Sequence, residues 1–130
     1  MSDNFIVEII SPEKLILRSE AAEITIPSYE GQMGILKDHI SLITFLRPGL
    51  ITIKKNKEEI VFFVEEDTVE FSNNNLLILS STIKSLDNFD SNSIDIIIKN
   101  SLEKMSNTQI TDKEKYLLSH KLDVLKEISK

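Results

Sequence analysis

The spacing of apolar residues changes once along this chain, and that change constrains the fold more than any other feature. Up to about residue 84 the apolar residues recur at every second position, as in FIVEIIS at 5–11, where Phe5, Val7 and Ile9 share one face. From about residue 91 they recur every three to four positions. A period of two is typical of half-buried strands, and a period of 3.6 is typical of amphipathic helices. The sequence therefore predicts a β domain followed by helices.

Further segments of the first part have the same alternation, at 22–28, 50–54 and 69–71. Two others, EIVFFV at 59–64 and LLIL at 76–79, are apolar on both faces, which predicts that they lie inside a sandwich. Turn residues such as RPG and NNN separate the segments. Short strands joined by tight turns predict that residues 1–85 form a mainly β sandwich or flattened barrel.

The second part is predicted to be a C-terminal antiparallel two-helix hairpin over 94–130, joined to the sandwich by a polar linker at 86–93. Thr111 and Glu114 have the spacing of a capping box at the start of the second helix. The predicted apolar stripes are Ile94, Ile97, Ile98, Leu102 and Met105 on the first helix, and Leu117, Leu118, Leu122, Val124, Leu125 and Ile128 on the second.

A hairpin of this size buries little against itself, so it must dock elsewhere. The pattern leaves open whether it docks on the sandwich or on another subunit. We predict that it docks on the sandwich and buries Leu118, Leu122 and Ile98 there. Ile96 falls opposite the stripe of its helix, where it is either simply exposed or in contact with a further partner.

Composition excludes several classes of function. The chain of 130 residues carries a formal net charge of -6, which argues against nucleic acid as a partner, because phosphate binding needs a basic surface. It has no cysteine, which rules out thiolate catalysis and zinc–thiolate sites. Neither a membrane-spanning run nor a signal peptide is recognisable, so we expect a cytoplasmic protein that does not insert into the membrane.

The motifs that resemble chemical sites are weak. Gly31 and Gly34 have GxxG spacing, but Ile-Leu follows them instead of the Lys-Ser/Thr of a phosphate loop, so we interpret them as turn or bulge glycines with positive φ. His39 is interpreted as a structural or interface residue instead of a catalytic base, and His120 as a solvated helix residue. No triad spacing surrounds either histidine.

Two acidic clusters, at 58–59 and 65–67, are the remaining candidates for ion binding. Neither has the spacing of a calcium loop, so we interpret both as solvated turns. The sequence thus predicts no catalytic residue, no metal site and no cofactor.

The segment IPSYEGQMGILKDHISLITFLRPGLITI at 26–53 resembles the signature of the epsilon subunit of bacterial F-type ATP synthases, which is equivalent to the mitochondrial delta subunit. The resemblance extends to the plan of a β-sandwich followed by two helices. The residues that match the signature in order and spacing are Glu30, Gly31, Gly34, Ile35, Leu36, His39, Leu42, Ile43, Thr44, Leu46, Pro48 and Gly49.

The resemblance implies a non-catalytic subunit of the rotary central stalk, on the cytoplasmic face of the bacterial inner membrane. Its sandwich would bind the gamma subunit and the ring of c subunits, through Glu30, Gly31, Gln32 and His39. The hairpin would reach the alpha/beta catalytic head and regulate ATP hydrolysis. Gln32 stands where the family commonly has an acidic residue.

Some bacterial members of the family bind ATP with a motif at the start of the first helix. Here Ile94 and Asp95 match the motif, but Ile98 and Lys99 occupy its Arg and Ala positions. An aliphatic side chain cannot make the bidentate phosphate contacts of a guanidinium. We therefore expect nucleotide binding to be weak or absent.

A free-standing β-sandwich interaction module with a helical dimerisation tail is the alternative function. The chain has no tryptophan and an aromatic content of 6%, which disfavours a sugar-binding platform. A homodimer that forms without gamma would support this alternative.

Overall fold

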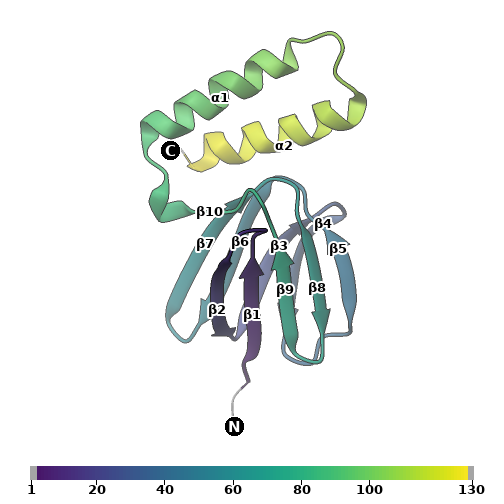
Figure 1. The fold of residues 1–130 in the computed structure, drawn as a ribbon, viewed down its shortest axis with the longest axis vertical. Coiled ribbons are helices and arrows are strands. Elements are labelled where there is room, and N and C mark those ends of the chain that lie inside the picture. Colours follow the sequence, from purple (N-terminus) through teal and green to yellow (C-terminus); the bar gives the residue numbers. More distant parts are fainter. Residues whose placement is uncertain (1–2, 129–130) are drawn as a thin grey trace.

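Two stacked sheets and a helical hairpin make up the computed structural model, which describes residues 3–128 (Figure 1). The helices lie across one end of the stacked sheets. The strands are β1 (Phe5–Ile10), β2 (Leu15–Ala21), β3 (Glu23–Ser28), β4 (Gly31–Leu36), β5 (Leu42–Phe45), β6 (Gly49–Lys55), β7 (Glu58–Val64), β8 (Thr68–Ser72), β9 (Asn75–Leu79) and β10 (Lys84–Ser85). A 3₁₀ turn η1 (Leu86–Asn88) leads into α1 (Ser91–Met105) and α2 (Asp112–Ile128).

The strands form two five-stranded sheets, with the orders β2-β1-β9-β8-β5 and β10-β7-β6-β3-β4. We call them the β1 sheet and the β6 sheet. The pair β1–β9 is parallel, and the other named pairs are antiparallel. This arrangement confirms the predicted β-sandwich followed by two helices. The segment 86–93, predicted as a linker, contains η1 and the first residues of α1.

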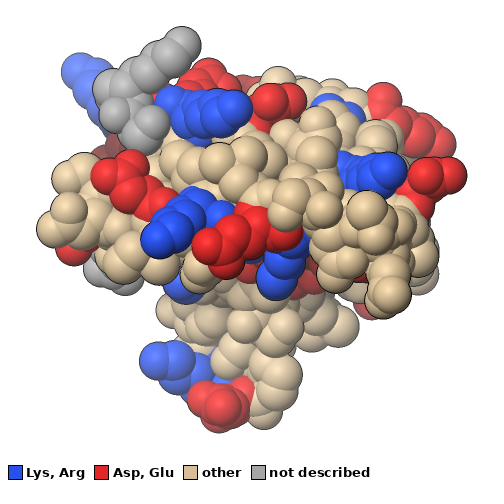
Figure 2. All heavy atoms as spheres, turned by 90° about the horizontal axis from the view of Figure 1, so that it is seen from above, with Lys and Arg blue, Asp and Glu red and all other residues tan. Residues whose placement is uncertain are grey.

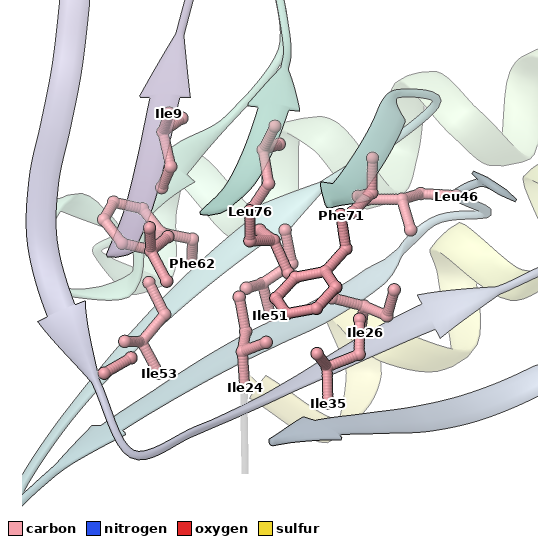
Figure 3. Close-up of a cluster of buried hydrophobic side chains, with 14 of the residues drawn as sticks. Ile9, Ile24, Ile26, Ile35, Leu46, Ile51, Ile53, Phe62, Phe71 and Leu76 are labelled. Atoms are coloured by element: carbon pink, nitrogen blue, oxygen red, sulfur yellow. The ribbon is translucent and has the colours of Figure 1, made fainter. Parts of the chain in front are cut away.

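The core fills the space between the two sheets, and both contribute to it (Figure 3). Period-two alternation places the inward side chains there, since successive side chains of a strand point to opposite faces. Phe71 of β8 packs edge-on against Phe5 of β1, with ring centroids 5.7 Å apart. The other core residues labelled in the figure are Ile9, Ile24, Ile26, Ile35, Leu46, Ile51, Ile53, Phe62 and Leu76.

The two segments that are apolar on both faces have different surroundings. In β7, Phe62 faces the sandwich core and Phe63 faces the hairpin, so the end of the strand near the hairpin is covered on both sides, as predicted. The prediction was wrong for the start of the segment, where Ile60 is 36% exposed. In β9, Leu76 and Ile78 are buried, but Leu79 is 49% exposed. The prediction that 76–79 lies wholly inside was therefore wrong, because the hairpin covers only the β6 sheet.

Side-chain caps mark the start of both helices. Asp90 caps α1 by accepting a hydrogen bond from Ser93 N through Oδ1 (2.7 Å). Because that bond favours the ionised carboxylate, the pKa of Asp90 is lowered. At α2, Glu114 N donates to Thr111 Oγ1 (3.1 Å), and that hydroxyl donates to Glu114 Oε1 (3.2 Å). The predicted capping pair is confirmed.

The buried face of α1 is rotated from the predicted one. Ser101 is 2% exposed, whereas Leu102, predicted to lie on the stripe, is 49% exposed. Ser101 follows Ile94 by two full turns and so faces the same side, whereas Leu102 falls about 80° away at 100° per residue. Ile96 is 61% exposed, so it takes no part in the contact with the sandwich.

The hairpin docks on the sandwich, as predicted, against residues of the β6 sheet at the end that the helices cross. Phe63 forms a buried cluster with Ile94 and Leu125, and Leu50 and Ile98 pack against it. Leu122 is buried, as predicted, whereas Leu118 stays partly exposed. The predicted stripe of α2 is confirmed by its three buried leucines, at positions 117, 122 and 125.

Gly49, the first residue of β6, lies too close to Pro27 for any side chain. An added Cβ would be 2.6 Å from Pro27 Cβ and 2.8 Å from its Cγ, and the proline ring is rigid. We expect Gly49→Ala to lower the free energy of unfolding by about 1–3 kcal/mol, as overpacked sites do.

Urea denaturation of the isolated chain measures this loss. Gly34→Ala is the matched control, since its Cβ would meet only Glu23 Oε1, at 3.8 Å. Equal stability of Gly49→Ala and the wild-type chain would contradict the steric account.

Candidate functional site

The four residues that the family resemblance assigns to partner contacts lie at two ends of the sandwich. Tyr29 and Glu30 form the β3–β4 turn at the end that faces the hairpin, Gly31 begins β4, and Gln32 follows it with an exposed side chain. We call this the hairpin end. Gly31 has a φ of 130°, so it needs to be glycine, and its carbonyl accepts a 2.7 Å hydrogen bond from Ser28 Oγ. Gly34 has no positive φ, so the prediction of positive φ holds for Gly31 only.

His39 lies at the opposite end, because β4 separates it from Gly31. Six strand residues span roughly 17–20 Å, so one small ligand cannot contact both. The His39 ring packs edge-on against Phe71, with centroids 6.0 Å apart, and its Nδ1 is 2.7 Å from the carbonyl oxygen of Ile40. Both contacts give His39 a packing role at the edge of the core.

The loop before His39 contains a residue in the left-handed region of the backbone. Asp38 adopts a φ of 68°. Aspartate tolerates this region better than most residues because its side chain can form local hydrogen bonds. Asp38 N donates to Asn74 Oδ1 (2.7 Å), and Asn74 Nδ2 donates to Asp38 Oδ1 (3.0 Å). These bonds join two turns at the opposite end.

A polar cluster lies where α2 meets the hairpin end. Arg47 Nη1 is 3.4 Å from both Tyr116 Oη and His120 Nε2, and Tyr116 Oη is 3.5 Å from the carbonyl oxygen of Tyr29. The rings of Tyr116 and His120 are in contact, with centroids 4.5 Å apart. The prediction that His120 is a solvated helix residue was therefore wrong, since its ring is half-buried between α2 and Arg47.

The acidic cluster at 65–67 also differs from a solvated turn. Glu65 forms an ion pair with Lys121 of α2. Asp67 is 8% exposed, and it accepts hydrogen bonds from Ser80 Oγ (2.8 Å) and Thr82 Oγ1 (3.3 Å). Glu66 is exposed and the side chain of Glu65 is 36% exposed, so the prediction was wrong for Asp67. Within residues 3–128, no group of three or more His, Cys, Asp and Glu side chains could hold a metal ion.

Burial raises the pKa of Asp67 from 3.8 to about 6, and the neighbouring charge of Glu65 adds to the rise. Because the folded-state pKa exceeds the unfolded one, this group favours folding fully below pH 3.8, and the contribution is lost as the pH rises through about 6. At neutral pH the ionised carboxylate therefore destabilises the fold.

We expect Asp67→Asn to raise the free energy of unfolding at neutral pH by about 1–3 kcal/mol, at 1.36 kcal/mol per unit of pKa. The amide keeps an acceptor for Ser80 and carries no charge. The gain should disappear below about pH 4, where aspartate is protonated in both states. Urea denaturation at both pH values measures it, with exposed Glu66→Gln as control. A less stable Asp67→Asn chain at neutral pH would contradict the assignment.

An exposed apolar surface covers the outer face of the β1 sheet near the hairpin end. Ile43 and Phe45 of β5 are 70% and 60% exposed, and Leu15 and Leu79 are about half exposed. We call these four residues the outer apolar surface. Strand pairing places one row of it side by side across the sheet, in the order Leu15, Ile10, Leu79, Thr68 and Phe45.

The outer apolar surface was missed in the sequence. Leu79 belongs to a segment interpreted as internal, and Ile43 was considered only as part of the family signature. The available signal was the excess of apolar residues over polar ones at 76–79 and 42–46. Several outward apolar side chains gathered on one sheet face form the kind of patch that is common at interaction sites of soluble proteins.

Comparison with known proteins gives the family. The model of the family described as "ATP synthase, Delta/Epsilon chain, beta-sandwich domain" matches residues 4–85. The chain belongs to the ATP synthase delta/epsilon family. The match covers all ten strands and ends where the helical part begins, and it confirms the predicted family.

Relatives extend the similarity to the helices. The "ATP synthase epsilon chain" of Pelagibacter ubique is 45% identical over 130 residues, which are 99% of this chain and 100% of that protein. The "ATP synthase epsilon chain 2" of Nitrobacter hamburgensis is 29% identical over 108 residues, covering 83% of this chain and 79% of the relative.

Solved structures share the fold at low sequence identity. A chain of the Euglena gracilis mitochondrial ATP synthase (OSCP/F1/c-ring, rotational state 1) superposes with a TM-score of 0.77 at 16% identity, covering 97% of this chain and 79% of that chain. A chain of the Tetrahymena thermophila mitochondrial ATP synthase (central stalk/c-ring) gives 0.63 at 18% identity, with 96% of each chain covered. Neither helix of residues 3–128 is long and apolar enough to cross a membrane.

Proposed function

We propose that this chain is the epsilon subunit of the central stalk of a bacterial, proton-translocating F-type ATP synthase. In this role it is a non-catalytic part of the rotor, which couples rotation to ATP synthesis, at the cytoplasmic face of the inner membrane. The observation that carries the proposal is the full-length identity of 45% to a protein named as an ATP synthase epsilon chain. The sandwich and the hairpin are both within the aligned length.

Gamma binds, in this proposal, along the outer face of the β1 sheet. The outer apolar surface supplies exposed aromatic and aliphatic side chains there, and burying such side chains drives most association. Ile40, which lies between His39 and β5, is also exposed. His39, assigned to gamma by resemblance, thus lies at one end of the proposed contact.

The c-ring contact is assigned, by resemblance, to Glu30, Gly31 and Gln32 at the β3–β4 turn. Both flanking side chains are exposed there. Gln32 is uncharged and contributes a hydrogen bond instead of an ion pair. The affinity of this contact should therefore depend less on salt than in family members with an acidic residue at this position.

The hairpin is the regulatory element of the proposal. Docked as described above, it leaves the head free, and extended into the alpha/beta head it blocks hydrolysis by obstruction. Positive and negative side chains are intermingled over the hairpin side of the molecule (Figure 2). Such a surface offers little net electrostatic attraction to the head. Inhibition would therefore depend mainly on steric obstruction by the helices.

Nucleotide binding is expected to be weak or absent. Ile94 is buried against Phe63, and Ile98 packs beside them, so neither side chain is free to contact a phosphate. Isothermal titration of ATP into the isolated chain should give no saturable heat. A dissociation constant in the low micromolar range would contradict this prediction.

Removal and return of the chain test the proposed function. Membranes from a bacterium whose own epsilon gene is replaced by this chain's gene should couple ATP hydrolysis to proton pumping. Membranes from a strain that carries neither epsilon gene should hydrolyse ATP but pump protons inefficiently. Equal pumping in the two preparations would refute the stalk assignment.

A further inference from the structure

The docked hairpin is held by a polar contact whose chemistry depends on one proton. His120 Nε2 lies 3.4 Å from Arg47 Nη1, across the boundary between α2 and the sandwich. A guanidinium has only donors, so Nε2 must be the acceptor of this contact. An imidazole nitrogen accepts only when it carries no proton. This hydrogen bond therefore forms only with neutral His120, with its proton on Nδ1.

Protonation of His120 would place two cations in contact. The ring is half-buried, and water screens such a pair less than it would in the open. Burial and the Arg47 charge both lower the pKa of His120, and Asp123 on the same helix raises it in part. The fold thus already favours the neutral ring.

The other charged groups near this contact are Asp123, Glu127, Lys121 and Glu65. Glu127 and Gln32 line the same hollow of about 320 Å³ as Arg47 and His120. The next residue of α2, Lys121, is paired with Glu65. The charge of Glu65 is therefore already balanced by Lys121. Within the described residues, no ion pair engages Arg47.

The apolar part of the dock is small, so the polar contact matters. Its buried cluster has three members, Phe63, Ile94 and Leu125, and the apolar residues packed against that cluster are only partly covered. When few buried side chains hold an element, its opening free energy is low, and one unfavourable charge contact is a large fraction of it.

We propose that His120 and Arg47 form a proton-operated latch, which holds the hairpin on the sandwich when His120 is neutral and releases it when His120 is protonated. This inference rests on the proposed function in one respect, namely that the hairpin has a released state. It adds the signal that shifts the balance between the two states.

The sign follows from proton linkage. The docked state lowers the proton affinity of His120, so it binds fewer protons than the released state. Docking is therefore favoured at a pH above the ordinary range of histidine and is weakened as the pH falls through that range. Acidification should release the hairpin.

Spin labels measure the docked fraction directly. The chain has no cysteine, so Glu58→Cys on β7 and Glu103→Cys on α1 introduce two unique sites, both exposed. Pulsed electron–electron double resonance on the full chain, with a spin label on each cysteine, gives the distribution of distances between the two labels. From about pH 8 to about pH 5, the docked distance should lose population to longer ones.

Four variants separate the latch from other titrations. His120→Gln, whose amide oxygen still accepts from Arg47, should keep the hairpin docked across this range. Arg47→Gln should greatly weaken the pH response. His39→Gln removes the only other histidine, and Asp67→Asn removes the buried carboxyl that titrates near pH 6, and both should respond as the wild-type chain does.

Two results would overturn the latch: no pH response in the wild-type chain, or the same response in His120→Gln. Binding of the same samples to gamma, through the sandwich, is measured separately. A chain that binds gamma but shows pH-independent docking refutes the latch alone. A chain that shows the pH response but does not bind gamma refutes the proposed function alone.

Discussion

Replacing Ile43 and Phe45 together with aspartate should weaken binding of this chain to gamma by about 100-fold or more. Central apolar anchors of an interface each contribute roughly 2 kcal/mol or more, and 100-fold corresponds to about 2.7 kcal/mol. Both side chains are more than half exposed on β5, so the chain itself should lose little stability. Biolayer interferometry with immobilised gamma measures the affinity.

Leu36→Asp is the matched control for this pair. Leu36 is 58% exposed, as apolar as Ile43, and belongs to β4 of the β6 sheet instead of the β1 sheet. It should leave the affinity for gamma within about threefold, which is under 1 kcal/mol. Equal losses in Leu36→Asp and the double variant would contradict the assignment of the gamma surface to the β1 sheet.

Deletion of residues 91–130 should raise the ATP hydrolysis rate of the assembled enzyme several-fold. Regulatory couplings commonly amount to roughly 1–3 kcal/mol, or about 5–150-fold. The deletion removes both helices and keeps every strand of the sandwich, so the remaining chain still carries its proposed gamma surface. Steady-state ATPase assays on purified complexes measure the rate.

The deletion also uncovers apolar residues, chiefly Phe63 and Leu50, which the hairpin covers. Retention of the shortened subunit in the complex therefore has to be verified on the same preparation. A second variant, with Phe63→Ser and Leu50→Ser added to the deletion, controls for the new apolar patch. An unchanged hydrolysis rate in complexes that retain the shortened subunit would refute inhibition by the hairpin.

Periodicity predicted the sandwich and the hairpin because each buries one face, and burial of one face is what a repeat of two or 3.6 reports. Phe5, Val7 and Ile9 are buried, as are Leu117 and Leu122. The same reasoning was wrong for Leu79, because a strand that is apolar on both faces is covered twice only if a second layer is present. Periodicity within one strand carries no information on that layer.

The contacts that fix the hairpin on the sandwich could not be predicted, because they join residues distant in the sequence. Arg47 and His120 are 73 positions apart, and Tyr29 and Tyr116 are 87 apart. In neither pair does the sequence spacing follow a motif that would predict the contact. Asp67 was interpreted as solvated because two glutamates precede it, yet Ser80 and Thr82 enclose it from another connection.

The proposal that this chain is a stalk subunit is tested most directly by co-expression with gamma. Size-exclusion chromatography with light scattering gives the mass and stoichiometry of what is purified. The stalk assignment predicts a stable complex of one copy of each chain, dissociated by the Ile43/Phe45 double aspartate variant. A homodimer of this chain that leaves gamma unbound would contradict it and favour the free-standing interaction module.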